Sequence, residues 1–163
     1  MLSFDPIDRA AQLWDERFGD ATSMRLVTSV MRVQQLLLAR IDLALRPFGV
    51  TFARYEVLVL LTFSRSGSLP LNKIGERLMV HPTSVTNAID RLEAQGLVTR
   101  TADSQDRRRI LASITSEGGQ VVAAGTKALQ DIHFAVSGLT PQEQHQAYAL
   151  LRSMRAAAGD FPA

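Results

Sequence analysis

The chain has 163 residues, of which 46% are hydrophobic and 21% charged, and its net charge is +2 at pH 7. This length and composition are typical of a soluble domain with a hydrophobic core. No apolar run approaches the roughly 18 residues of a membrane span, and no basic segment precedes an apolar one at the N-terminus, so we expect a cytoplasmic protein. The absence of cysteine excludes disulfides, thiol nucleophiles and Cys-ligated zinc.

Basic residues are unevenly distributed along the chain. All but Lys73 and Lys127 are arginines, and arginine suits bidentate contacts with phosphate and guanine, although GC-biased codon usage would give the same composition. Residues 1–22 are acidic, whereas four arginines stand against two aspartates in residues 100–109. We therefore expect any DNA-facing surface in the second stretch.

The N-terminal part of the chain is predicted to be helical. Residues 6–18 form a short amphipathic segment, and apolar residues recur at spacings of three and four from Ser23 to Phe48, which predicts a long helix. The Pro47-Phe48-Gly49 sequence closes this helix.

The next predicted helix covers residues 52–64, with Thr51 as its N-cap. Apolar residues from Phe52 to Phe63 lie on most of its sides, which is typical of a buried helix. Residues 64–68 are predicted to form a loop.

Two short helices follow, over residues 71–78 and from Pro82 onward. Proline at the first helical position costs no hydrogen bond, and Gly96 marks the end of the second helix. One side of this second helix is apolar, through Val85, Ala88, Ile89 and Leu92. Its opposite face is polar, through Thr83, Thr86, Asn87, Asp90 and Arg91.

The C-terminal third begins with two predicted strands, residues 97–101 and 109–115, joined by a polar tip over residues 102–108. A long helix is predicted after Thr115, with an apolar side that reaches Val136. The last helix opens at Thr140 with a capping box, and residues 156–163 are expected to be a frayed tail.

The order of elements over residues 71–115 predicts a helix-turn-helix followed by a hairpin wing, in a mainly α-helical fold. A helix in the major groove must bury one stripe and present short polar side chains to base edges. We expect the recognition helix to contact DNA through Thr83, Ser84, Thr86, Asn87 and Arg91. Asn87 can pair with adenine, and the tip arginines Arg107 and Arg108 can enter a narrow minor groove.

Other interpretations of these segments remain open. A helix with a polar outer face is usually a surface helix, an arginine-rich turn is usually a solvated loop, and a winged helix can bind protein instead of DNA. An enzyme is disfavoured, because His81, His133 and His145 form no local triad or metal pair and no phosphate-binding loop is present. We therefore expect no catalytic residues, metal or cofactor.

Residues 57–118 resemble MarR-type transcriptional regulators in three stretches that occur in the family's order. These stretches read LNKIGERL at 71–78, TSVTNAIDRLEAQGLV at 83–98 and DRRRILASITSEG at 106–118. The third is similar to the family's wing pattern, in which an acidic residue, any residue and an arginine precede a strand and Thr-x-x-Gly.

The resemblance implies roles for the wing and for the flanking helices. Arg108 would be the minor-groove arginine and Asp106 its orienting partner. Residues 51–115 would form the DNA-binding lobe, while residues 1–50 and 116–163 would form the interface of a homodimer. Such dimers bind pseudo-palindromic operators on double-stranded DNA, usually as repressors, and typically release DNA when a small aromatic or anionic ligand enters a pocket between the lobes.

The N-terminal segment is similar to the extra helix of the urate-responsive and PecS-like branch of this family, in which Trp14 would match the pocket tryptophan. The match is partial, because Glu56 stands where that branch has Asp and Arg65 is the base nearest to its arginine position. Trp14 can equally be a core or dimer anchor. The candidate effector-pocket residues are Trp14, Arg25, Phe52, Tyr55, Glu56, Phe63 and Arg65.

Overall fold

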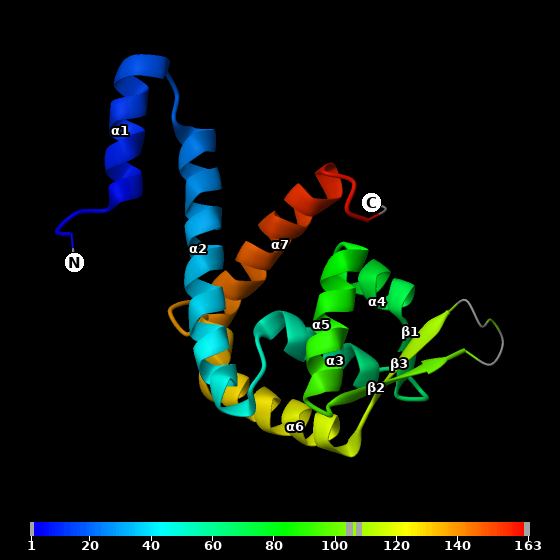
Figure 1. The fold of residues 1–163 in the computed structure, drawn as a ribbon. Helices are drawn as coiled ribbons and strands as arrows, with labels where there is room; N and C mark the ends of the chain where they lie inside the picture. Colours follow the sequence, from blue (N-terminus) through cyan, green and yellow to red (C-terminus); the bar gives the residue numbers. More distant parts are fainter. Residues whose placement is uncertain (1, 104–105, 107–108, 162–163) are drawn as a thin grey trace. The chain divides into compact units, whose positions relative to one another are not determined.

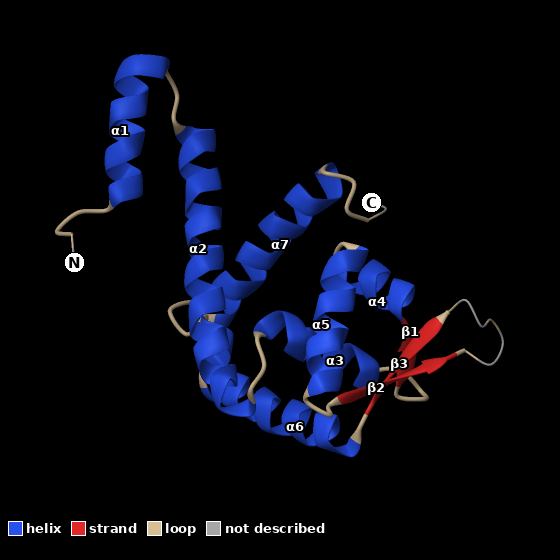
Figure 2. Ribbon diagram, in the orientation of Figure 1, coloured by secondary structure: helices blue, strands red, loops and turns tan. Residues whose placement is uncertain are grey.

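The computed structural model describes residues 2–103, 106 and 109–161, which form two compact units, residues 1–40 and 41–163. Helices dominate both units, and a small antiparallel sheet belongs to the second (Figures 1 and 2). This mainly α-helical fold with a hairpin wing confirms the predicted fold class.

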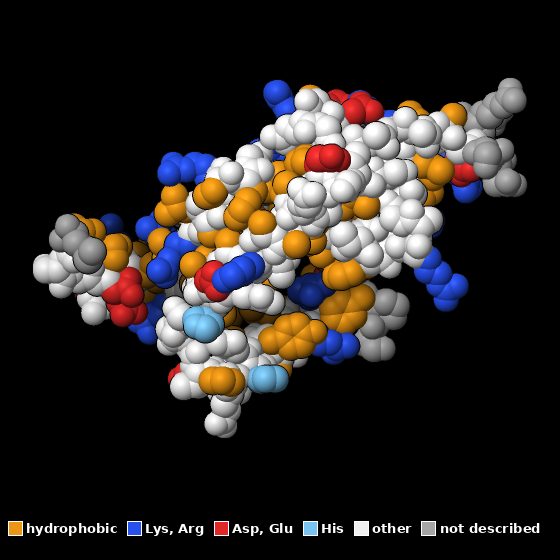
Figure 3. Space-filling view, turned by 90° about the horizontal axis from the view of Figure 1, so that it is seen from below, with side chains coloured by type: hydrophobic (Ala, Val, Ile, Leu, Met, Phe, Trp, Pro, Cys, Tyr) orange, Lys and Arg blue, Asp and Glu red, His pale blue; other side chains and the backbone are white. Residues whose placement is uncertain are grey.

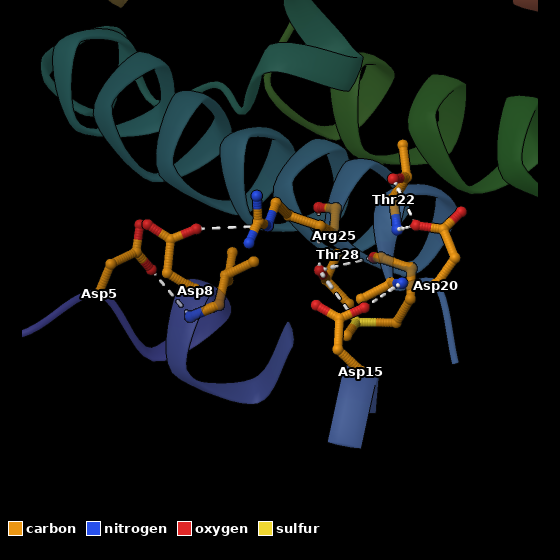
Figure 4. A network of polar contacts seen from close by, with 10 residues as sticks. Asp5, Asp8, Asp15, Asp20, Thr22, Arg25 and Thr28 are labelled. Carbon is orange, nitrogen blue, oxygen red and sulfur yellow. Dashed lines mark hydrogen bonds and ion pairs between the residues drawn. The ribbon is translucent and has the colours of Figure 1, made fainter. Parts of the chain in front are cut away.

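The first unit consists of helix α1 (Pro6–Phe18) and most of helix α2 (Thr22–Leu45). Aspartates hold the connections of this helical pair: Asp5 accepts a hydrogen bond from the Ile7 N–H at 2.8 Å, and Asp15 accepts one from the Ala21 N–H at 2.8 Å (Figure 4). These side chains satisfy backbone donors that would otherwise lack partners at the start of a helix and in the turn.

The second unit begins with the end of α2, the 3-10 turn η1 (Arg46–Phe48) and helix α3 (Phe52–Thr62). The predicted long helix to Phe48 thus ends at Leu45, because an α-helix through Pro47 would lose a hydrogen bond and crowd the preceding turn. Thr51 is the N-cap residue, as predicted, but its side chain does not cap. The Phe52 N–H instead donates to Asp42 Oδ1 at 2.7 Å.

Helix α3 is buried on one side, through Tyr55, Val57, Leu58 and Leu61. The prediction that Phe63 belongs to this buried helix is wrong, because the helix ends at Thr62 and the Phe63 side chain is 77% exposed. The Tyr55 hydroxyl lies 2.6 Å from the Thr126 hydroxyl and joins α3 to helix α6 (Ser116–Asp131).

The sheet contains β1 (Ser68–Pro70), β2 (Val98–Ala102) and β3 (Ile110–Ile114) in the order β1-β3-β2, with both pairs antiparallel. The two hairpin strands confirm the prediction within one residue at each end. Strand β1 lies partly in the predicted loop, since three residues ending in proline show no alternating pattern. The Ser68 and Ser113 hydroxyls, 2.6 Å apart, lie opposite each other on β1 and β3.

The C-terminal region contains α6, the 3-10 turn η2 (His133–Ala135) and α7 (Pro141–Ala157). The prediction of one helix reaching Val136 is wrong, because α6 ends at Asp131 and three successive residues, 133–135, have positive φ. Ile132, His133 and Phe134 are all weak helix formers, which favours a break there. The capping box of α7 is confirmed: Glu143 N–H donates to the Thr140 hydroxyl while Thr140 N–H donates to the Glu143 carboxylate.

Gly118 allows α6 to pack closely against the segment that precedes β2. A Cβ atom there would lie 2.3 Å from the Leu97 carbonyl oxygen, whereas a Cβ at the neighbouring Gly119 would meet nothing within 4 Å. We therefore expect Gly118→Ala to lower the free energy of unfolding by about 2 kcal/mol or more. Gly119→Ala, the matched control, should be neutral or stabilise by up to about 1 kcal/mol.

Urea unfolding followed by circular dichroism, at equal protein concentration, measures both changes. Equal midpoints for the two variants would show that Leu97 does not pack against Gly118 as described.

Candidate nucleic-acid interface

Helices α4 (Leu71–Leu78) and α5 (Pro82–Ala94) form a helix-turn-helix. Met79 ends α4 in the left-handed conformation, at φ +55°, so the chain turns sharply between the helices. Gly75 permits this close packing, since a Cβ there would lie 3.3 Å from both the Val80 carbonyl oxygen and Val85 Cγ2. The His81 ring accepts from the Thr83 N–H at 3.3 Å, so His81 is the N-cap of α5.

The apolar stripe of α5 is buried through Val85, Ile89 and Leu92, which are each at most 2% exposed. This burial fixes the rotation of the helix about its own axis, because the apolar residues have only one side on which to pack. All five residues predicted for DNA contact are exposed, namely Thr83, Ser84, Thr86, Asn87 and Arg91. The structure thus brings these side chains together on one open helix face.

Hydrogen bonds and shallow grooves shape this face. The Thr86 hydroxyl donates to the Pro82 carbonyl oxygen at 3.1 Å, which leaves its oxygen free to accept. A groove of about 460 Å³ is lined by Asn87, Asp90, Arg91 and Ala94. A second groove of about 540 Å³ opens between α4 and α5 and includes Thr86 in its wall.

The hairpin β2–β3 extends from the same unit beyond α4 and α5 (Figure 2). Of the predicted wing residues, Asp106 is described, whereas Arg107 and Arg108 lie outside the described residues. Asp106 accepts from Arg109 Nε at 3.3 Å, and its carbonyl oxygen accepts from the Arg109 N–H at 2.8 Å. These contacts hold the Asp106 carboxylate beside Arg109, the residue that precedes β3.

Three further charged residues meet between α5 and β2 in a contact that the sequence analysis did not predict. Arg100 on β2 donates from Nη1 to Asp90 at 2.7 Å and from Nε to Glu93 at 2.8 Å. These hydrogen bonds lower the pKa of the Glu93 carboxyl and raise the pKa of the Arg100 guanidinium. Separations of seven and ten residues across a turn carry no local signal, so only the strand pairing reveals this contact.

The candidate effector residues of the first unit are Trp14 and Arg25. The centroids of the Trp14 and Phe18 rings lie 5.0 Å apart on α1, and the Trp14 residue is 41% exposed. The Arg25 guanidinium pairs with the Asp8 carboxylate at 3.4 Å (Figure 4). Arg25 is thus already engaged by an acidic neighbour within its own unit.

The remaining effector candidates belong to the second unit, where the Phe52 and Tyr55 rings are stacked with their centroids 6.3 Å apart. Partial burial raises the pKa of the Glu56 carboxyl. Phe63 and Arg65 are exposed beyond the end of α3. The second unit therefore gathers the aromatic pair but leaves Phe63 open to solvent.

Over residues 2–103, 106 and 109–161, no group of three His, Asp or Glu side chains is placed to hold a metal ion. Within the same residues, no helix combines the length and the apolar character that crossing a membrane requires.

A helix-turn-helix with an exposed polar second helix and an adjoining hairpin defines the winged helix-turn-helix class. The MarR family model matches residues 53–110. The chain is 39% identical over 113 residues to the HTH-type transcriptional repressor MdtR of Bacillus subtilis (strain 168). The aligned stretch covers 68% of this chain and 70% of that protein.

Solved structures agree with this match. The MarR family transcriptional regulator Sco5413 of Streptomyces coelicolor is 52% identical, with a TM-score of 0.79 over 85% of this chain and 96% of that one. MepR of S. aureus, solved as a DNA complex, is 26% identical, with a TM-score of 0.73 over 80% and 96%. The chain belongs to the MarR family of transcriptional regulators, a class of regulators and not of enzymes.

Truncating a side chain should affect the free energy of unfolding very differently on the two faces of α5. Asn87 is exposed, so Asn87→Ala should change the free energy of unfolding by no more than about 0.5 kcal/mol. Ile89 is fully buried, so Ile89→Ala should lower it by about 2–5 kcal/mol. Urea unfolding of both variants beside the wild type measures these changes, and a large loss in Asn87→Ala would mean that Asn87 is part of the core.

Proposed function

We propose that this protein is a homodimeric transcriptional repressor that binds a pseudo-palindromic operator and leaves it when a small ligand binds. The exposed polar face of α5, held outward by its buried stripe, is the observation that carries the proposal. Short polar side chains at the start of a helix fit the major groove, where Asn87 pairs with adenine and Thr83 contacts neighbouring base edges. The N-terminus of α5 adds backbone N–H groups for a phosphate.

The wing supplies the second contact with the duplex. Arg107 and Arg108 enter the adjacent minor groove, with Asp106 orienting the tip, in keeping with the family's wing pattern. Two relatives support this mode of action by name: MdtR is a transcriptional repressor, and MepR was solved as a DNA complex. Residues 51–115 form the DNA-binding lobe in this proposal.

Residues 1–50 and 116–163 form the dimer interface. Support comes from apolar side chains that each unit leaves exposed. No residue of α7 is buried, although its side chains include Tyr148, Leu150 and Leu151, all at least 44% exposed. Helix α2 likewise exposes Leu26, Val27, Met31, Val33, Leu36 and Leu38. Apolar stripes of this extent need a partner surface, and a second copy also places paired recognition helices about 10 bp apart.

Ligand release follows from linkage: a ligand that prefers a different spacing of the two lobes lowers DNA affinity. The aromatic pair Phe52 and Tyr55 favours an aromatic ligand, and Arg25 and Arg65 favour an anionic one. Trp14 in the first unit, and Glu56 and Phe63 in the second, are the further ligand-contacting candidates of this proposal, in which α1 is similar in role to the extra helix of the urate-responsive and PecS-like branch. A screen of aromatic acids and phenols for release of a bound duplex tests this part of the proposal.

The wing assignment predicts the salt dependence of DNA binding. Arg108→Ala should weaken binding to all sequences and reduce the slope of log K against log salt by about one unit, because one phosphate neutralisation is lost. Fluorescence anisotropy with a labelled duplex over a range of salt concentrations measures the slope. Lys127→Ala removes an exposed cation from α6 and serves as the control, with the slope expected to stay unchanged.

The recognition-helix assignment predicts a change in sequence preference. Duplexes bound by the wild type, selected from a random pool, should contain two half-sites about 10 bp apart. Asn87→Ala should relax the preference at one base position in each half-site by about 1–3 kcal/mol, because a bidentate pair with adenine is lost. Identical preferences for the variant and the wild type would remove Asn87 from the set of base-contacting residues.

A further inference from the structure

The recognition face of α5 contains a carboxylate in an electrostatically unfavourable place. Asp90 follows Thr86 and Asn87 by one helical turn and shares the polar groove with Asn87 and Arg91. A carboxylate at this position would face the phosphates of any duplex that these side chains approach. Phosphate density along DNA is high, so an unpaired negative charge here opposes binding.

Glu93 adds a second negative charge at the end of the same helix. It lies in the last turn of α5, where the helix carbonyls already present a partial negative charge. The helix dipole does not offset these charges, and Arg91, which is exposed and lines the same groove as Asp90, forms no ion pair with Asp90 or Glu93 in the described part of the chain. The balancing charge must come from another element.

Arg100 on β2 provides that charge with a fork of donors. Its Nη1 reaches Asp90 at 2.7 Å, its Nε reaches Glu93 at 2.8 Å, and its Nη2 also bonds Glu93. The Arg100 backbone N–H donates to the Glu93 carboxylate at 3.2 Å. The guanidinium is only 29% exposed and is the least exposed member of the cluster, so its donors are directed to the carboxylates.

We propose that Arg100 is a positioning residue for DNA binding, which pairs with Asp90 and Glu93 on the recognition helix, offsets part of their negative charge and does not itself contact DNA. This inference rests on the proposed function, because the carboxylates matter only if α5 faces a duplex. Two other roles are possible for these groups: Arg100 could bind a phosphate directly, or Asp90 could accept a hydrogen bond from cytosine. The variants below separate the three roles.

The experiment compares duplex affinities of the full-length protein at one salt concentration and well below the unfolding midpoint of every variant. The wild type must first show salt-dependent binding, and its failure to bind any duplex would reject the proposed function itself. Arg100→Gln then leaves two unbalanced carboxylates and should weaken binding about tenfold or more. Lys127→Gln also removes one ion-paired cation, and its side chain is 76% exposed on α6, outside the apolar stripes of α2 and α7, so this variant should bind like the wild type.

The deciding variant is the triple substitution D90N/E93Q/R100Q, which removes the cation together with both carboxylates. If Arg100 acts through charge neutralisation, the triple variant recovers affinity to within about threefold of the wild type. If it stays as weak as Arg100→Gln, then Arg100 contacts DNA directly and the inference is overturned. Wild-type affinity in Arg100→Gln would overturn it as well.

A last variant covers the case in which Arg100→Gln does not fold. D90N/E93Q keeps the arginine and removes both negative charges from α5, so it should bind at least as tightly as the wild type. A loss of tenfold or more in this variant would show that a carboxylate contacts the duplex and would contradict the inference. Thermal unfolding of each variant, followed by circular dichroism, confirms that the affinities compare folded proteins.

Discussion

The burial of one side of α5 is the constraint on which the rest of this protein depends. The side chains of Val85, Ile89 and Leu92 are all buried in the core. The helix is therefore held in one orientation about its own axis, because any other would expose these apolar side chains to water. That rotation leaves Thr83 and Asn87 outward together on an open surface. The polar face is thus a consequence of core packing, and its geometry is as rigid as the core beneath it.

The second consequence of this packing is electrostatic. A helix that reads DNA must offer polar groups without accumulating negative charge, yet α5 contains Asp90 and Glu93. Strand β2, which follows the helix, brings Arg100 back beside α5, where its guanidinium pairs with both carboxylates. In the proposed function, the hairpin serves α5 in two ways: it extends the DNA-contacting surface as a wing, and it places a positive charge beside the two carboxylates.

Much of this architecture follows from local patterns in the sequence, because helix periodicity, prolines at the starts of helices and the Thr140 capping box are short-range signals. The structural features that the sequence did not predict depend on contacts between residues far apart along the chain. Asp42, ten residues away, caps α3 in place of Thr51, and the pairing of β1 depends on a strand some forty-five residues along the chain. For the candidate site, the exposed face of α5 was predictable from spacing, whereas the Arg100 cluster required the hairpin geometry.

The proposed function requires that the exposed face of α5 contacts duplex DNA. Nuclear magnetic resonance of the full-length protein, titrated with a duplex selected from a random pool, measures this contact residue by residue. The largest amide shift changes should fall on residues 83–91, with further changes at Asp106 and Arg109. Binding that leaves the signals of Thr83 and Asn87 unchanged, with shifts confined to α1 or α7, would contradict it.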